Sequence, residues 1–198
     1  MPKIKAASVA EHVAEQEQAV FSTAIRLFLE RGYENVTLGD IAVGIGLARN
    51  SLYRYFPDKA HILLRWFQDE LPRQASRSAE LLGGPGSPVR RIEAWALDQL
   101  DYAATPEHAL IAAIGTIVPD LDPATRAELA ASHDAMLRPL LDTLHEAGIE
   151  TAGEQRVVAS MIQQLVLATA RADVSPSAPG RRYLLQAIRG LLGQPLTR

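Results

Sequence analysis

A short polar run, Arg49, Asn50, Ser51, Tyr53 and Arg54, combines residue types with well-defined hydrogen-bonding chemistry. An Arg side chain can donate two hydrogen bonds to O6 and N7 of guanine, and Asn can bond N6 and N7 of adenine. The hydroxyl groups of Ser and Tyr suit phosphate oxygens, which fix the position of a protein on the duplex without reading its sequence. The run therefore indicates contact with double-stranded DNA.

Residues on either side of this run extend the expected contact. Thr37 and Lys59 each stand at the start of an expected helix, where backbone N–H groups can bind a phosphate. Taken singly, Arg54 is equally a solvated surface charge, and Tyr55 equally a core residue. The expected DNA-binding residues are Thr37, Ala48, Arg49, Asn50, Ser51, Tyr53, Arg54, Tyr55 and Lys59.

The elements that must position these side chains form a helix-turn-helix between Thr37 and Phe56, TLGDIAVGIGLARNSLYRYF. We expect helices over 38–44 and 48–55, the first begun by a capping box of Thr37 and Asp40. The motif needs a small residue where the helices cross, a turn residue that tolerates positive φ, and apolar residues that point into a three-helix core. These roles fall, in order, to Ala42, to Gly46, and to Ile41, Ile45, Leu47 and Leu52. An αα-hairpin without a nucleic-acid role is the structural alternative.

Residues 28–63 resemble the DNA-binding domain of TetR-family transcriptional regulators. The resemblance rests on the family's pattern of a glycine turn, two short helices and a Tyr-x-Tyr-Phe-x-Asp-Lys ending. The matching residues are Leu27, Phe28, Glu30, Gly32, Tyr33, Val36, Thr37, Ile41, Ala42, Gly46, Leu47, Leu52, Tyr53, Tyr55, Phe56, Asp58, Lys59 and Leu63. Ile45, Gly44 and the pair His61-Ile62 depart from the usual pattern.

The resemblance implies an all-helical homodimer. An N-terminal three-helix head binds DNA, and a variable C-terminal body binds a small molecule and dimerises through its last two long helices. The implied function is a ligand-responsive transcriptional regulator, a repressor that a small molecule releases from a palindromic operator. An activator of the same fold, a DNA-independent helical dimeric sensor or adaptor, and a small helical enzyme are the alternatives.

The rest of the chain favours helix, because Ala, Leu, Arg, Glu and Gln dominate and alternating β-branched runs are missing. We expect an all-α fold in two domains, a DNA-binding domain over 1–57 and a ligand-binding and dimerisation domain over 58–198. Pro72 is expected to bend or divide its helix, and Pro139 to kink its own. The nine expected helices span 9–31, 38–44, 48–55, 59–81, 88–103, 106–118, 123–147, 151–173 and 179–193.

Two C-terminal helices are candidates for a dimer interface. Residues 157–170 are apolar on most sides, so one face is expected to need a partner, and a two-fold dimer is the commonest solution. A central core helix in a monomer would explain the same pattern. The expected interface residues are Val158, Met161, Ile162, Leu165, Val166, Tyr183, Leu184, Ile188 and Leu191.

A ligand pocket in the C-terminal body is expected to combine apolar bulk with a few polar groups. This composition suggests an apolar or amphipathic effector, although ordinary core packing would account for each residue by itself. The candidates are Trp66, Phe67, Trp95, Tyr102, His108, His133, Met136 and Gln163.

Composition excludes several other classes. The formal net charge is −3, from 20 Lys and Arg against 23 Asp and Glu, which argues against a protein that coats nucleic acid or membrane by charge alone. Between residues 47 and 66, however, four basic residues face Asp58 alone, a local charge of +3. The chain has no Cys, no close pair of His ligands, and no nucleophile or phosphate-binding motif, so we expect no cofactor, no metal ion and no enzyme. The apolar runs are too short for a membrane span or a signal peptide, which favours a cytoplasmic protein.

Overall fold

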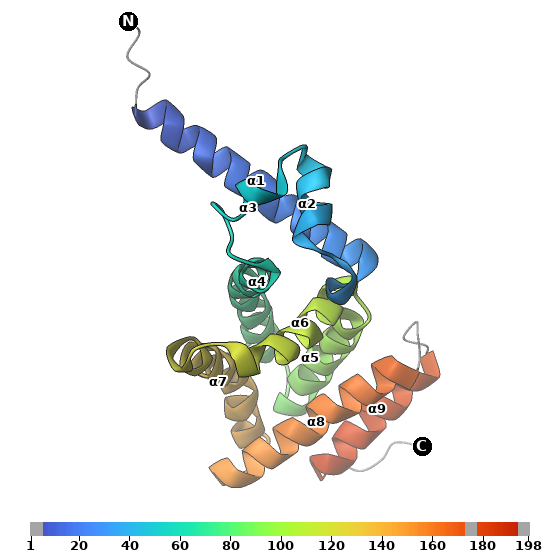
Figure 1. Cartoon of the computed structure of the whole chain (residues 1–198). Helices are drawn as coiled ribbons and strands as arrows, with labels where there is room; N and C mark the ends of the chain where they lie inside the picture. The colour runs from blue at the N-terminus through green and yellow to red at the C-terminus, as the bar shows by residue number, and fades with distance from the viewer. Residues whose placement is uncertain (1–5, 173–177, 194–198) are drawn as a thin grey trace, which may run out of the picture. The chain divides into compact units, whose positions relative to one another are not determined.

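A computed structural model of the chain describes residues 6–172 and 178–193. Within these ranges there are nine α-helices, two short 3₁₀ helices and no strand, which confirms the expected all-α fold (Figure 1). The helices are α1 (Ala6–Arg31), α2 (Leu38–Ile45), α3 (Arg49–Leu52), α4 (Lys59–Leu82), α5 (Pro88–Ala103), α6 (Pro106–Ile117), α7 (Pro123–Glu146), α8 (Ala152–Ala172) and α9 (Ala178–Leu191), with η1 (Tyr33–Asn35) and η2 (Val118–Asp120). None of the helices in these ranges is long and apolar enough to cross a membrane.

Side-chain caps set several helix starts. Ser87 accepts a hydrogen bond from the backbone N–H of Arg90, and Asp122 accepts from the N–H groups of Ala124 and Thr125. A proline follows each of these caps at the first helical position, where its missing N–H costs nothing. The starts of α5 and α7 are thus encoded locally, which is why their expected first residues are confirmed.

One expected helix is longer than the observed one, and one proline does not divide its helix. The helix expected over 48–55 is only Arg49–Leu52, because Ala48 supplies no capping side chain and the chain tightens into a turn in which the N–H of Tyr55 donates to the carbonyl of Leu52 at 2.8 Å. Pro72 does not divide α4, which continues through it to Leu82, and the alternative expectation of a bend stays a prediction.

The chain divides into two compact units. The first holds the residues up to Asp69 together with Ala109–Asp120, and the second holds Glu70–His108 and the residues from Leu121 onward. The functional boundary at residues 57 and 58 stays a prediction; as a packing unit, the first extends into α4 and includes α6 from Ala109 onward. Helix α4 contributes residues to both units.

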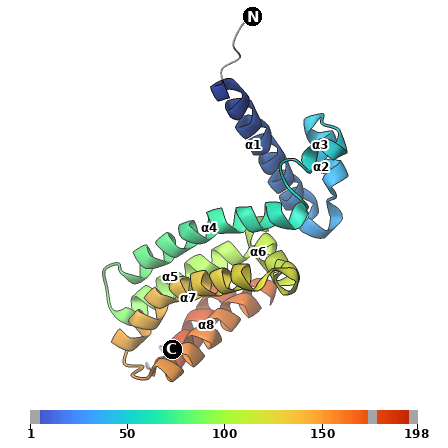
Figure 2. The same cartoon turned by 60° about the vertical axis from the view of Figure 1, so that its left-hand side comes forward.

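The core of the first unit lies among α1, α2, α3, the first half of α4 and α6. In Figure 2, α2 and α3 lie against one side of α1 near its C-terminal end. The buried residues are Val20, Ala24, Leu27, Phe28, Tyr33, Val36, Leu38, Ile41, Ala42, Leu52, Phe56, Ile62, Leu63, Trp66, Leu110, Ile114 and Ile117.

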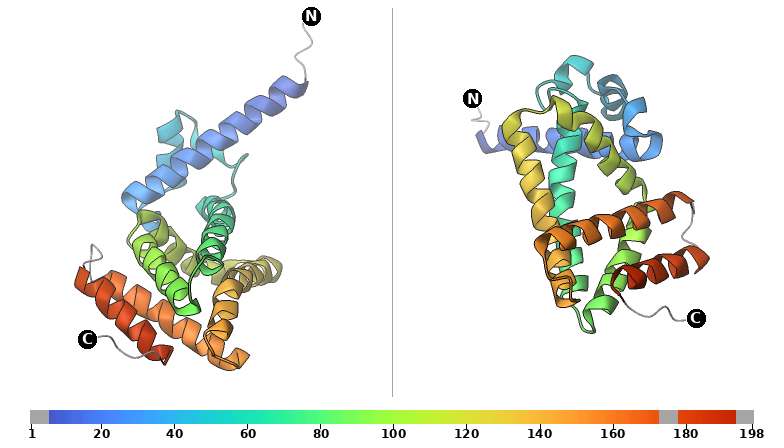
Figure 3. Two further views of the ribbon diagram at one scale, coloured as in Figure 1. Left: turned by 180° about the vertical axis from the view of Figure 1, so that it is seen from behind. Right: turned by 90° about the horizontal axis from the view of Figure 1, so that it is seen from below.

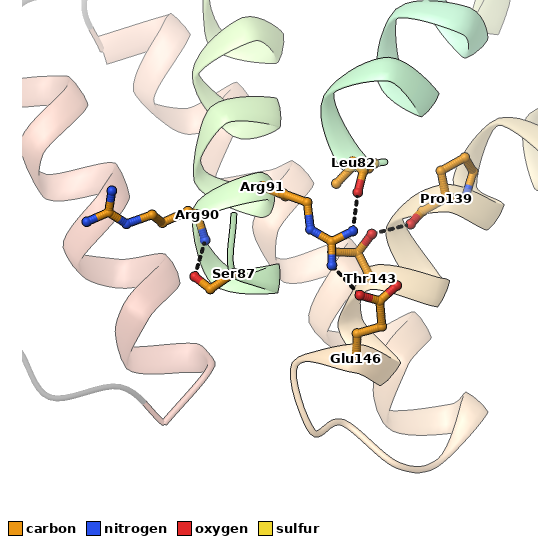
Figure 4. A network of polar contacts seen from close by, with 7 residues as sticks. All are labelled: Leu82, Ser87, Arg90, Arg91, Pro139, Thr143 and Glu146. Atoms are coloured by element: carbon orange, nitrogen blue, oxygen red, sulfur yellow. Dashed lines mark hydrogen bonds and ion pairs between the residues drawn. The ribbon is translucent and has the colours of Figure 1, made fainter. Parts of the chain in front are cut away.

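In the second unit, α8 packs against α5, α7 and α9, and runs beside α9 in both views of Figure 3. A polar network joins the ends of α4, α5 and α7 (Figure 4). Arg91 donates to the carbonyl of Leu82 at 2.6 Å and pairs with Glu146, and its side chain is 12% exposed. Thr143 donates to the carbonyl of Pro139 at 2.8 Å, within the continuous helix α7. Because the Arg91 guanidinium is mostly buried, these bonds hold the three helix ends in place.

Candidate nucleic-acid interface

The turn between α2 and α3 has the geometry of a helix-turn-helix. Gly46 takes a left-handed conformation with φ of 69°, which a side chain would strain. The N–H of Leu47 then donates to the carbonyl of Ala42 at 3.0 Å and closes the turn. Ile41, Ala42 and Leu52 are buried, as predicted, so the inward faces of both helices are fixed by the core of the first unit.

Helix α2 packs tightly against α1 at Gly44, a contact that the sequence pattern did not identify. A Cβ added at Gly44 would lie 2.8 Å from Cγ2 of Thr23. Ala42, which was expected to be the small residue where α2 and α3 cross, is buried, and the close fit of α2 to α1 lies one half-turn further along, at Gly44. The departure from the family pattern at Gly44 is therefore a packing requirement of this chain.

Gly44→Ala should destabilise the protein by about 1 kcal/mol, because the overpacking cost exceeds the gain in helix propensity. In a Thr23→Ser background, which lacks the methyl group that the new Cβ meets, the same change should be stabilising by several tenths of a kcal/mol. Urea unfolding of the four proteins in this cycle measures both values. An equal effect of Gly44→Ala in the two backgrounds would contradict the close approach.

The outward face of α3 carries the predicted contact residues. Arg49, Asn50 and Arg54 are exposed, and Tyr53 is 49% exposed. Ser51 is half-buried. Neither arginine pairs with a carboxylate in the described part of the chain, so both guanidinium groups remain available to an anionic partner.

The two residues at the edges of this face differ in their exposure. Tyr55 is half-buried against the core, and the guanidinium carbon of Arg54 lies 5.6 Å from the centre of its ring. Ala48 is exposed immediately before α3. The structure thus gathers Ala48, Arg49, Asn50, Ser51, Tyr53, Arg54 and Tyr55 around one short helix.

Thr37 forms the predicted capping box with Asp40. Its hydroxyl donates to Oδ2 of Asp40 at 2.5 Å, its backbone N–H donates to the same oxygen at 2.8 Å, and the N–H of Asp40 donates to its hydroxyl at 3.2 Å. The bond from the Thr37 hydroxyl, above all, holds the pKa of Asp40 below its usual range. The Asp40 carboxylate therefore already accepts the hydroxyl and the backbone N–H of Thr37, the residue that was expected to face a phosphate.

Lys59 is held by the loop that follows α1. Its Nζ donates to the carbonyl of Tyr33 at 2.8 Å and to that of Glu34 at 3.4 Å, and lies 4.2 Å from the centre of the Tyr33 ring. Burial, with the nearby charges of Glu34 and Asp58, raises the pKa of Tyr33 to about 12. This ammonium group ties the start of α4 to the turn before α2, a contact across 26 residues that the sequence pattern did not indicate.

Lys59→Met should therefore act on stability more than on phosphate binding. Loss of a half-buried charged donor should lower the free energy of unfolding by about 1–2 kcal/mol. The slope of log affinity for DNA against log salt should be unchanged, whereas Arg54→Met, the matched control just after α3, should lower it by about 1 for each protomer, or about 2 for a bound dimer. A reduced slope for Lys59→Met would instead identify Lys59 as a phosphate contact.

Some of the basic groups behind the local charge of +3 between residues 47 and 66 form contacts within the protein itself. Arg65 pairs with Glu17 at 2.5 Å, and its guanidinium lies 4.8 Å from the centre of the Phe21 ring. With Lys59 and Arg65 engaged, Arg49 and Arg54 are the basic groups of the 47–66 segment that face outward. Among the described residues, no cluster of His, Asp or Glu could hold a metal ion.

The expected ligand-pocket residues are divided between the two units. Trp66 is buried in the core of the first unit, and Phe67 packs against it. In the second unit, Trp95 is buried and His133 is exposed. The other four candidates in this unit are half-buried: Tyr102, His108, Met136 and Gln163. Trp66 and Phe67 thus pack in a different unit from the other candidates.

The expected dimer residues separate into an inner and an outer set. Ile162, Val166, Leu184 and Ile188 are buried in the chain's own core and cannot reach a partner, a correction to the predicted interface. The helices α8 and α9 use one apolar stripe each for this core. Val158, Met161, Leu165, Tyr183 and Leu191 remain wholly or partly exposed. Three of them help to line an apolar hollow of about 670 Å³, formed by Ser160, Met161, Gln164, Leu165, Ala168, Ala187, Gly190 and Leu191.

Comparison with known proteins places these features among bacterial regulators. Residues 20–65 match the family described as bacterial regulatory proteins, tetR family. A curated relative, the HTH-type transcriptional repressor Rv1474c of Mycobacterium tuberculosis, is 30% identical over 106 residues, which are 53% of this chain and 52% of that protein. The chain thus spans about half the length of this relative.

Solved structures with the same fold cover nearly the whole chain. A transcriptional regulator of the TetR/AcrR family from Thermobifida fusca superposes with a TM-score of 0.63 and 22% identity, covering 90% of this chain and 97% of that one. A transcriptional regulator from Saccharomonospora viridis, described in complex with choline, gives 0.67 and 19% identity, covering 93% and 99%. These likenesses extend the shared fold through α9.

Proposed function

We propose that this chain, which belongs to the TetR family of bacterial regulatory proteins through residues 20–65, is a ligand-responsive transcriptional repressor. The observation that carries the proposal is the outward face of α3, where Arg49, Asn50, Tyr53 and Arg54 are exposed around a helix fixed by the Gly46 turn. These groups suit guanine and adenine edges in the major groove and phosphates beside it. The relatives are named as transcriptional regulators, which supports a role in regulation and not in catalysis.

The active form is a homodimer on a palindromic operator. A recognition helix as short as Arg49–Leu52 contacts few base pairs, so specific binding needs two copies in successive major grooves, about 34–36 Å apart. The outer faces of α8 and α9 supply the contact between copies, and exposed apolar residues such as Met161 and Tyr183 support this role.

The effector binds in the second unit and releases the operator. A ligand can do this only by binding one spacing of the two heads better than the other. Helix α4 is the connector, since Leu63 lies in the core of the first unit and Leu82 in that of the second. The choline complex described for a structural relative supports a small-molecule effector for this chain.

Footprinting of the full chain on the DNA upstream of its own gene tests this function. We expect protection of two symmetric half-sites one helical turn apart, bound by two protomers, and reduced transcription from a promoter that overlaps them. A DNA-independent sensor would give no protected site, and an activator would raise transcription from the same promoter. Either result would contradict the proposed function as a repressor.

A further inference from the structure

A stripe of polar side chains lies between α4 and α5 inside the second unit. Glu70, Gln74 and Ser78 succeed one another every four residues on α4, in the half of that helix that lies beside α5 (Figure 2). On the facing helix, Tyr102 donates from its hydroxyl to Oε1 of Glu70 at 3.2 Å, and Trp95 donates from Nε1 to Oγ of Ser78 at 3.1 Å. The two helices therefore run antiparallel with their polar residues turned toward each other.

Glu70 is a buried acid whose charge is weakly matched. The residue is 9% exposed, and its Oε1 accepts from Nε2 of Gln74 at 2.7 Å as well as from Tyr102, both neutral donors. The nearest cation, the guanidinium of Arg73, stands 3.7 Å from Oε2, and its side chain is 77% exposed. A buried carboxylate is costly without a close, well-oriented cation, so Oε2 can accept a further positive group.

Gln99 presents an unused donor on the same face of α5. It lies four residues after Trp95 and three before Tyr102, the spacing that places all three on one side of a helix. Its Nε2 is buried and has no hydrogen-bond partner in the described part of the chain. A buried amide donor of this kind calls for an acceptor that the fold itself does not provide.

Aromatic rings belong to the same stripe. The rings of Tyr102 and His108 meet edge to face with their centres 5.8 Å apart, and Trp95 is buried at the other end of the stripe. Burial and, less strongly, the charge of Arg171 hold the pKa of His108 below its usual range, so its ring stays uncharged at neutral pH. Glu70 is thus the buried acid of the stripe, and the charge of Glu107 also acts on Tyr102.

We propose that this stripe recognises the effector and that the effector is an amphipathic organic cation with a hydrogen-bond acceptor. Its ammonium group lies against Oε2 of Glu70, its acceptor takes the N–H of Gln99, and its apolar part packs on the rings of Tyr102 and Trp95. The role of the cation as an effector rests on the proposed function, whereas its binding does not require DNA. Glu70 and Gln99 were absent from the pocket expected from sequence.

Calorimetric titration of the full chain with benzoylcholine and with 3,3-dimethylbutyl benzoate tests the charge. The two molecules differ only in a quaternary nitrogen replaced by carbon. We expect the wild type to bind benzoylcholine at least about tenfold more tightly. Glu70→Gln keeps an acceptor for Tyr102 and Gln74 but should remove this preference. Glu80→Gln, an exposed acid on the same helix, should keep it.

Gln99→Leu tests the acceptor. It should weaken benzoylcholine, which carries an ester, and leave 4-phenylbutyltrimethylammonium, which has none, unaffected. Equal affinity of the wild type for the charged molecule and its carbon analogue, or a preference that persists in Glu70→Gln, would overturn the proposal. Equal weakening of both cations by Gln99→Leu would overturn the acceptor contact. If Glu70→Gln does not fold, judged by circular dichroism, the wild-type comparison and Gln99→Leu still decide.

A gel shift without ligand separates this inference from the proposed function. Glu70→Gln and Gln99→Leu should bind the upstream DNA as the wild type does. If the protein prefers the cation but binds no DNA, the proposed regulatory function is wrong and the proposed cation site stands. If the protein binds DNA but does not prefer the cation, only the proposed cation site is wrong.

Discussion

Arg49→Ala combined with Tyr53→Ala should abolish specific binding of the protein to its operator. Both side chains are exposed on the outward face of α3, so their removal leaves no cavity and should leave the fold intact. Loss of one bidentate contact between Arg and guanine costs about 1–3 kcal/mol, and a dimer loses it at both half-sites. Gel shifts on the upstream DNA, compared with a random duplex of equal length, measure the effect.

Arg90→Ala is the matched control for this prediction. Arg90 is exposed on α5, and its hydrogen bond to Ser87 comes from the backbone, so the variant removes the same charge elsewhere (Figure 4). It should bind the operator with nearly wild-type affinity. If the double variant on α3 also binds like the wild type, the DNA-binding interpretation of this face is wrong.

Phe28→Ala should give the largest loss of stability in the first unit. Phe28 is 1% exposed, and its ring meets that of Tyr33 edge to face with centres 5.2 Å apart. Truncation of a buried Phe costs about 3–5 kcal/mol through lost burial and the cavity that remains. This is a large share of the 5–15 kcal/mol that stabilises a typical domain, so DNA binding should fail as well. Urea unfolding followed by circular dichroism gives the value.

Val43→Ala on α2 is the comparison. Val43 is 83% exposed, so its truncation should change the free energy of unfolding by less than about 0.5 kcal/mol. Similar losses for the two variants would show that the core of the first unit is not centred on Phe28. The pair therefore tests whether the head is held by this core.

Local signals explain how much of the fold could be predicted. Caps at Thr37, Ser87 and Asp122 and the positive φ of Gly46 act within three or four residues, so the sequence by itself determined the order and approximate bounds of the helices. The Tyr53-x-Tyr55-Phe56 ending and the spacing of the two short helices likewise carried the resemblance to the TetR family, whose model matches residues 20–65. Helix ends that lack such signals, as at Ala48, were predicted less well.

The tertiary structure alone decided which groups remain available for function. Lys59 is held by Tyr33, Gly44 is held close to Thr23, and Arg65 pairs with Glu17. Each contact joins residues at least 21 positions apart, and no pattern of residue types states which distant partner a side chain will meet.

The same reason explains the second unit. An apolar helix such as α8 has the composition of an interface on every side, and only packing against α5 and α9 divides its inner residues from its outer ones. The spacing of residues in the sequence thus predicted a short helix, observed to begin at Arg49 with Arg54 just beyond its end, and the binding of DNA by these two residues stays a prediction. The tertiary structure decided that Glu70 and the side-chain nitrogen of Gln99 would each be buried, because burial and pairing depend on the three-dimensional positions of distant residues.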